Sequence, residues 1–205
     1  MGYRDEILRH MAAHFGPLQE LALHEILPVT GIAVHFIPAG PGRDGQVAFT
    51  TGMSDHAQAV PPGQEEYRHT ELMIHLPADW PTTREALADP ARFWPIRWLK
   101  EVAAYPRAAD TWLGGAFPII SSDDPPAPLG PGTDLSCLLL LRVLGEEGTV
   151  RCDDGTAVAL YHVLPIYTEE RDLEIRAGIG ELLGRLQAHQ VPFEVDPARV
   201  NVATA

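Results

Sequence analysis

The sequence predicts an α+β fold, in which a mixed, mostly antiparallel sheet of about seven strands is flanked by about three helices. Segments with the two-residue alternation of strands occur in runs, and they do not alternate strictly with helical segments. All four tryptophans fall between residues 68 and 120, where we expect the core to gather because large aromatic side chains bury much apolar area. The length of 205 residues suits a single domain over residues 1–205.

The N-terminal quarter predicts one helix followed by strands. Ile7, Met11 and Phe15 form an apolar stripe, which predicts an amphipathic helix over residues 5–15. Strands are expected in residues 18–26, 31–37 and 46–51. A turn rich in proline and glycine separates the last two of these strands, so we expect them to form a hairpin.

The centre of the chain predicts a strand followed by a helix. Residues 70–76 alternate strictly, which predicts a strand with one apolar and one mostly polar face, ended by Pro77. A short helix is expected over residues 84–88. Apolar residues then recur at steps of three and four from Phe93 to about Tyr105, which predicts a helix that Pro106 ends, because the ring clashes with a continuing turn.

After a proline-rich surface loop at residues 121–133, the chain predicts further strands. The segment 135–143 is nearly all apolar, as expected of a strand buried on both faces. Two turns of acidic residues and glycine are predicted to join it, in a meander, to strands over residues 149–152 and 158–163.

The last predicted element is a helix that begins at Thr168. Its first turn carries two acidic residues, which favour a helix N-terminus. The expected apolar stripe consists of Ile175, Ile179, Leu182 and Leu186.

The net charge of −13 disfavours nucleic acid and membrane surfaces as partners and favours cationic ones, unless it serves solubility alone. No apolar run has the length of a membrane helix, and the N-terminus lacks a secretory pattern, so we expect a cytoplasmic protein. Cys137 and Cys152 are then expected to be free thiols.

Catalytic and metal-binding patterns are weak in this sequence. The motifs of nucleophile elbows, phosphate-binding loops, zinc proteases and dithiol sites are missing, so we expect no enzyme and no cofactor. His69 and Glu71 share a strand face with His75, but the two histidines would lie roughly 20 Å apart at a rise of about 3.3 Å per residue, too far to share an ion. His10 and His14, four residues apart on a helix, are more readily explained as surface residues.

Five ordered blocks of sequence carry a resemblance to a known family. The blocks are TGMSD (51–55), YRHTELMIHLPADW (67–80), WPIRWLK (94–100), YPR followed by TWLGG (105–115) and YHVLPIYTEE (161–170). With these blocks the chain resembles the suppressor-of-fused family, and in particular its bacterial single-domain members. The resemblance implies a protein that binds other proteins, with an extended peptide adding to the sheet. It also implies a link to toxin loci, where such proteins look like immunity proteins.

Charged and aromatic residues in or near these blocks are the candidate partner-binding residues. They are Asp55, Arg68, Glu71, Asp79, Trp80, Lys100, Trp112, Glu169 and Glu170. In one interpretation they line an acidic groove that captures a basic, nuclease-type toxin; in the other, the charges pair with each other and fix loop geometry. Two further functions remain open: a regulatory or scaffold protein that binds a peptide, and an enzyme with a site between the central strand and the C-terminal helix.

Overall fold

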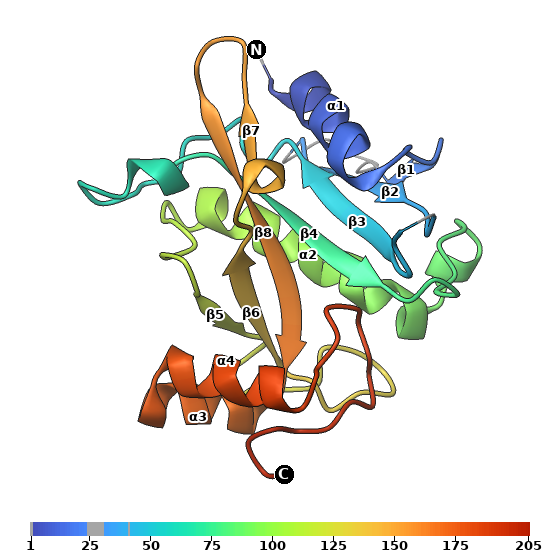
Figure 1. Ribbon diagram of the computed structural model, residues 1–205, viewed down its shortest axis with the longest axis vertical. Helices are drawn as coiled ribbons and strands as arrows, with labels where there is room; N and C mark the ends of the chain where they lie inside the picture. The colour runs from blue at the N-terminus through green and yellow to red at the C-terminus, as the bar shows by residue number, and fades with distance from the viewer. Residues whose placement is uncertain (1, 24–30, 41) are drawn as a thin grey trace.

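The computed structural model describes residues 2–23, 31–40 and 42–205. In these residues a mixed sheet of eight strands is flanked by four α-helices (Figure 1). The helices are α1 (Arg4–Phe15), α2 (Pro90–Ala108), α3 (Thr168–Ala177) and α4 (Ile179–Ala188). The strands are β1 (Ala22–Leu23), β2 (Ala33–Ile37), β3 (Gln46–Thr51), β4 (Thr70–Leu76), β5 (Ile119–Ser121), β6 (Cys137–Arg142), β7 (Thr149–Arg151) and β8 (Ala157–Ile166). The predicted α+β class is confirmed.

The sheet has the strand order β1-β2-β3-β4-β8-β6-β5, and β7 pairs with β8. The pair β4–β8 is parallel, and the remaining pairs are antiparallel. The predicted hairpin of β2 and β3 is confirmed. Because the ten-residue β8 has β4 on one edge and both β7 and β6 on the other, it forms the centre of the sheet.

The predicted meander after residue 135 is wrong. Its second turn joins β7 and β8 as a hairpin, but its first turn is a short 3-10 helix, Glu146–Gly148. That turn leads the chain from β6 to β7 along the same edge of β8, so β6 and β7 pair with β8 and not with each other. The long strand β8 therefore pairs with the two shorter strands β6 and β7, one after the other along the same edge.

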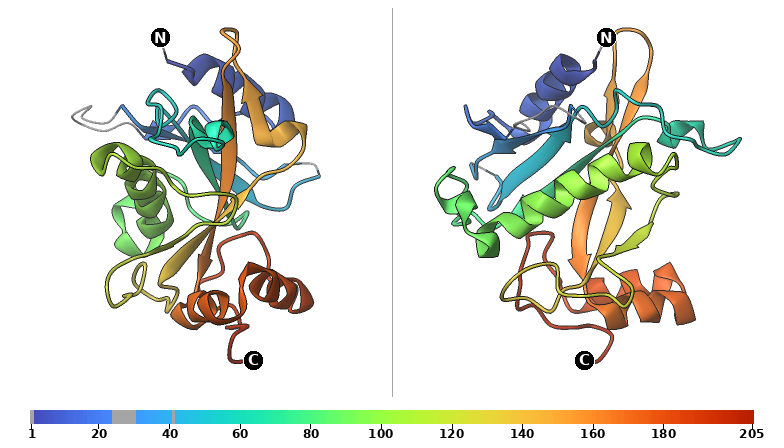
Figure 2. Two further views of the ribbon diagram at one scale, coloured as in Figure 1. Left: turned by 90° about the vertical axis from the view of Figure 1, so that its left-hand side faces the viewer. Right: turned by 180° about the vertical axis from the view of Figure 1, so that it is seen from behind.

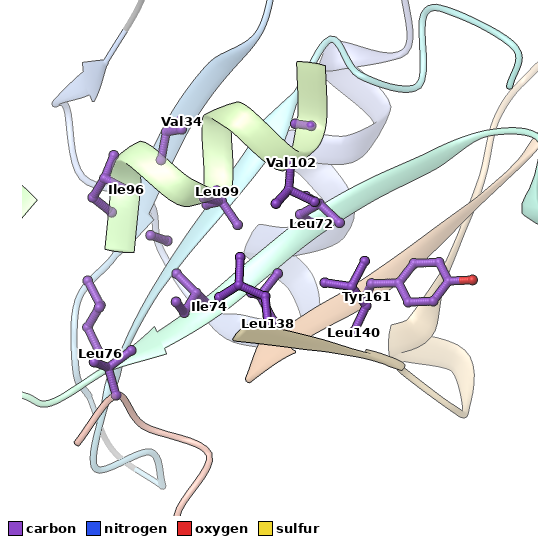
Figure 3. Packing of buried hydrophobic residues seen from close by; sticks show 14 of the residues in the cluster. Val34, Leu72, Ile74, Leu76, Ile96, Leu99, Val102, Leu138, Leu140 and Tyr161 are labelled. Atoms are coloured by element: carbon purple, nitrogen blue, oxygen red, sulfur yellow. The ribbon is translucent and has the colours of Figure 1, made fainter. Parts of the chain in front are cut away.

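Helices cover both faces of the sheet. Figure 2 shows α2 on one side and α1 on the other. On the α2 side, Ile96, Leu99 and Val102 pack toward apolar side chains of the central strands, among them Leu72 and Ile74 (Figure 3). On the other side, Ile7 and Met11 of α1 form a second cluster with Met73 and residues of β3, β7 and β8.

This coverage corrects the prediction for β4. Every residue of the strand is buried except His75, which is partly buried, so neither face is a polar surface. The alternation correctly predicts that β4 has two different faces. However, Glu71 and His75, the polar side chains on one of these faces, point into the protein. The reason is tertiary: α1 packs on the face that the alternation predicts to be exposed to solvent, with Ile7 and Met11 in the same apolar cluster as Met73.

Three other elements differ from the prediction. The helix α2 extends past Pro106 to Ala108, because the ring is buried in the core and the turn continues through a bond from Ala109 N–H to the Tyr105 carbonyl. The short helix at 84–88 is a 3-10 turn, Ala86–Ala88. Of the strand predicted at 18–26, Ala22 and Leu23 form β1, and residues 24–30 lie outside the described part.

The predicted C-terminal helix is two helices, α3 and α4. Gly178, with φ of +86°, adopts a left-handed backbone conformation that ends the first and begins the second. Because the helix is interrupted at Gly178, Leu182 and Leu186 of α4 pack with residues of β6 and β8 in a third apolar cluster. Ile175 of α3 is exposed. None of the helices in the described residues is long and apolar enough to cross a bilayer.

Candidate protein-interaction site

Glu71, one of the predicted partner-binding acids, is fully buried at the start of β4. One carboxylate oxygen accepts hydrogen bonds from the Ser54 backbone N–H (3.0 Å) and hydroxyl (2.7 Å), and the other accepts one from the Thr50 hydroxyl. Burial raises the pKa of Glu71 to about 7, against the effect of these hydrogen bonds. The side chain therefore holds the turn after β3 in place.

Glu170 is also fully buried, and it pairs with Arg199. Its carboxylate accepts hydrogen bonds from both terminal nitrogens of the Arg199 guanidinium, from Val202 N–H (3.0 Å) and from Tyr167 N–H (3.0 Å). These contacts tie the C-terminal segment to the first turn of α3. Removing one member of such a buried pair typically costs about 3–5 kcal/mol.

Two of the predicted acids thus do not belong to an acidic surface, which corrects the sequence interpretation for Glu71 and Glu170. Trp80 is buried as well, at 6% exposure, and its indole N–H donates to the Arg92 carbonyl at 3.1 Å. All three side chains stabilise the fold, but none of these contacts joins two of the nine candidate residues: Glu71 bonds to Thr50 and Ser54, and Glu170 pairs with Arg199. Because all three are buried, a partner cannot reach them in this conformation.

The other predicted residues do not all gather in one place. Lys100 on α2 and Trp112 are partly buried, with the Trp112 ring 6.1 Å from that of Tyr67. Arg68 and Asp79 are exposed, but they flank opposite ends of β4, a strand of seven residues that spans about 20 Å. The exposed Glu169 accepts a hydrogen bond from Asn201 on α3's side of the molecule. The nine predicted residues therefore do not form one groove.

Asp55 is exposed, and Tyr3 links it to the acidic turn between β7 and β8. The Tyr3 backbone N–H donates to Asp55 at 3.0 Å, and the Tyr3 hydroxyl donates to Asp154 at 3.2 Å. Tyr3 thereby links the turn after β3 to the turn between β7 and β8. Figure 1 shows the N-terminus and the β7–β8 hairpin at the same end of the molecule.

We call this cluster the acidic end. Its members are the exposed residues Asp5, Asp55, Asp153 and Asp154. Hydrogen bonds from the Thr156 backbone and hydroxyl lower the pKa of Asp154, which keeps its carboxylate charged. The sequence predicts only that Asp153 and Asp154 lie in a turn. No local signal places them near Asp55, because they lie about 100 residues after it along the chain.

Metal and thiol chemistry find little support in the described part of the chain. There, no group of three or more histidine, cysteine, aspartate or glutamate side chains could hold a metal ion. Cys137 and Cys152 are buried free thiols, as predicted, and burial raises the pKa of both, for Cys152 to about 11. A thiol with a raised pKa carries little of the reactive thiolate.

Comparison with known proteins identifies the family. The family profile described as "Suppressor of fused protein (SUFU)" matches residues 28–200, which is most of the chain. The chain belongs to the suppressor-of-fused family. No curated protein matches it.

Solved structures of the family share the fold. A suppressor-of-fused homologue from Neisseria gonorrhoeae FA 1090 has a TM-score of 0.62 at 15% identity, with 98% of this chain and 96% of that chain covered. A chain of the Sufu–Fu complex has a TM-score of 0.67 at 16% identity, with 98% and 92% covered. Drosophila Suppressor of Fused has a TM-score of 0.59 at 14% identity, and the match covers 98% of this chain but 50% of that chain. Fold and family together support a suppressor-of-fused-like protein-binding module.

Proposed function

We propose that this protein binds a cationic protein partner at its acidic end, and that the partner is a basic, nuclease-type toxin which it neutralises. The observation that carries the proposal is the acidic end itself. Four exposed carboxylates from three separate segments gather there, and Tyr3 fixes two of those segments to each other. A complex of a family member, the Sufu–Fu complex, supports a protein as the partner.

Electrostatics explains why such a partner would be basic. The net charge of −13 attracts cations over a long range and accelerates their encounter with the protein. A nuclease needs a basic active-site surface because its substrate carries a phosphate charge at every nucleotide. An acidic body docked on that surface would exclude the nucleic acid.

Binding of a peptide as an added strand, which the resemblance implied, has less support. The strands at the two ends of the sheet, β1 and β5, have two and three residues in the described part of the chain. Short edge strands offer few free backbone groups for a new strand. Capture through charged side chains needs no such edge.

The test measures binding to the basic protein encoded by the neighbouring gene, by calorimetry at 50 and 300 mM salt, together with inhibition of its nuclease activity. We expect binding that weakens with salt. In the triple variant Asp55→Asn, Asp153→Asn, Asp154→Asn it should weaken about tenfold, from roughly 0.5 kcal/mol per exposed charge pair. Asparagine keeps one acceptor oxygen, which suffices for the Tyr3 backbone N–H at residue 55 and for the Thr156 N–H at residue 154. At residue 154 its NH2 group can donate to the Tyr3 hydroxyl oxygen in place of accepting from that hydroxyl.

A matched control removes the same charge elsewhere. The variant Asp79→Asn, Glu85→Gln, Asp134→Asn neutralises three exposed acids outside the acidic end and should change the affinity less than twofold. If both triple variants lost the same affinity, the loss would come from net charge alone, and the acidic end would not be the binding site. Failure to bind at either salt concentration would overturn the toxin as partner, and a regulatory peptide partner would then be the better hypothesis.

A further inference from the structure

A second candidate site lies on the sheet face opposite α2. The side chains of Met73 and His75 from β4, His162 from β8 and Leu141 from β6 line a groove of about 510 Å³ there. Alternate residues of a strand share a face, and the neighbours Leu72, Ile74 and Tyr161 pack on the α2 side instead. Figure 1 views the groove side, with α1 above and α4 below, and Phe15 and Leu183 from these helices line the groove.

One buried and one partly buried histidine distinguish this groove from an ordinary apolar depression. His162 is 4% exposed, and neither of its ring nitrogens has a hydrogen-bond partner among the described residues; Nδ1 of His75 also lacks one. The two rings lie 4.9 Å apart, and the Phe193 ring meets that of His162 edge-on, also at 4.9 Å. Buried polar groups are nearly always paired in folded proteins, so unpaired nitrogens in a groove indicate a place for a ligand.

The protonation state of His162 limits what that ligand can be. Burial lowers the pKa of His162 well below its usual value, and the nearby His75 lowers it further. The Phe193 backbone acts in the opposite direction but lies outside hydrogen-bonding geometry. The ring is therefore neutral, and a neutral imidazole offers one N–H donor and one acceptor nitrogen.

Among the described residues that line this groove, Arg142 is the one arginine or lysine, and it already bonds within the protein. The Arg142 guanidinium donates through Nη1 to the carbonyls of Val143, Gly148 and Leu160 and through Nη2 to the Thr149 hydroxyl, so both terminal nitrogens are engaged within the protein. The net charge of −13 further disfavours a carboxylate or phosphate. An anionic group on a ligand is accordingly disfavoured.

We propose that this groove binds a largely apolar small molecule that carries a hydroxyl group, of the phenol or long-chain alcohol class. A hydroxyl both donates and accepts, so it can pair with the acceptor nitrogen of one imidazole and the N–H of the other. Sites for small molecules in proteins typically have a volume of this size and an apolar lining with a few polar groups, and this groove has both.

The rim of the groove supports the apolar part of this assignment. Six large apolar side chains are exposed in the described part of the chain, and three of them, Phe117, Leu144 and Phe193, line this groove. Their exposed fractions are 42%, 78% and 58%. A ligand with an apolar body would cover them, while its hydroxyl reached the histidines on the floor.

The test compares two probes, 4-hexylphenol and 4-hexylanisole, which differ in that the second has a methyl group on its oxygen and cannot donate. Calorimetry should give about tenfold tighter binding of 4-hexylphenol, and the nitrogen resonances of the His162 ring should shift on its addition. In His162→Phe, which keeps a ring of similar size, the two probes should bind equally. The control His56→Phe changes an exposed histidine outside the groove and should retain the tenfold preference.

A second variant protects the test against misfolding of His162→Phe. Leu183→Trp fills the groove from α4 and should abolish binding of both probes while His162 remains. Equal affinities of the two probes for the unaltered protein would overturn the proposal, as would a tenfold preference that persists in His162→Phe. Binding of a tyrosine-containing peptide but not of 4-hexylphenol would make the groove a protein-docking surface and overturn it as well.

Discussion

Replacing Glu71 by glutamine should stabilise the protein above neutral pH and leave its stability near pH 4.5 unchanged. The pKa of Glu71 is raised by burial from 4.5 to about 7 in the folded protein. Between these two pH values the unfolded chain has already lost the proton that the folded protein still holds. Stability therefore falls as the pH rises from 4.5 through 7, and a shift of this size amounts to about 3 kcal/mol above pH 8.

Glutamine fits the site because it resembles the protonated carboxyl group. Its oxygen can accept both bonds from Ser54, and its amide can donate to the Thr50 hydroxyl oxygen, which also accepts from Leu72 N–H at 2.9 Å. Above pH 8 we expect Glu71→Gln to be more stable than the unaltered protein by up to about 3 kcal/mol, the penalty that ionisation imposes.

The assay is urea denaturation at half-unit steps from pH 4.5 to 8.5. The difference in free energy of unfolding between Glu71→Gln and the unaltered protein isolates this one group from the histidines and other acids. As a control, Glu85→Gln, which changes an exposed residue, should give a flat difference near zero. A constant difference across the pH range for Glu71→Gln would refute the reasoning, because it would mean that Glu71 ionises equally in the folded and unfolded states.

Two further substitutions test how the fold is held together. Arg199→Met leaves the Glu170 carboxylate buried without its partner, so the free energy of unfolding in urea should fall by about 3–5 kcal/mol; a loss below 1 kcal/mol would contradict the pairing. Gly52→Ala should lower the melting temperature more than Gly155→Ala: both glycines have positive φ (+95° and +88°), but only at Gly52 would the added Cβ lie 2.4 Å from a backbone oxygen. Equal losses would show that the backbone conformation alone matters.

Short-range patterns predicted the elements of this fold well. The strands β2, β3 and β4 and the helix α1 follow from periodicity and from the turn residues between them. The pairing of strands was less accessible, since β4 lies beside β8 across more than 80 residues of chain. The break between α3 and α4 depends on Gly178, which resembles an ordinary helical glycine until its φ of +86° is known.

The candidate site was harder to predict than the fold. Alternation along β4 placed Glu71 on a polar face, but the residues that pair with it, Thr50 and Ser54, come from a segment about 20 residues earlier. Glu170 likewise depends on Arg199, almost 30 residues later. Whether an acid is buried or exposed is decided by such distant donors, and the sequence alone does not reveal them.

The buried acids still bear on the proposed function, because they position the exposed ones. Glu71 binds both the backbone and the hydroxyl of Ser54, the residue directly before Asp55. Tyr3 then holds the Asp55 carboxylate from the other side and reaches Asp154 with its hydroxyl. A charged group held from two directions loses less conformational entropy on binding than one on a free loop, so the same negative charge gives a tighter complex. An internal carboxylate and a surface carboxylate thus act on one turn, the first by fixing its shape and the second by facing a partner.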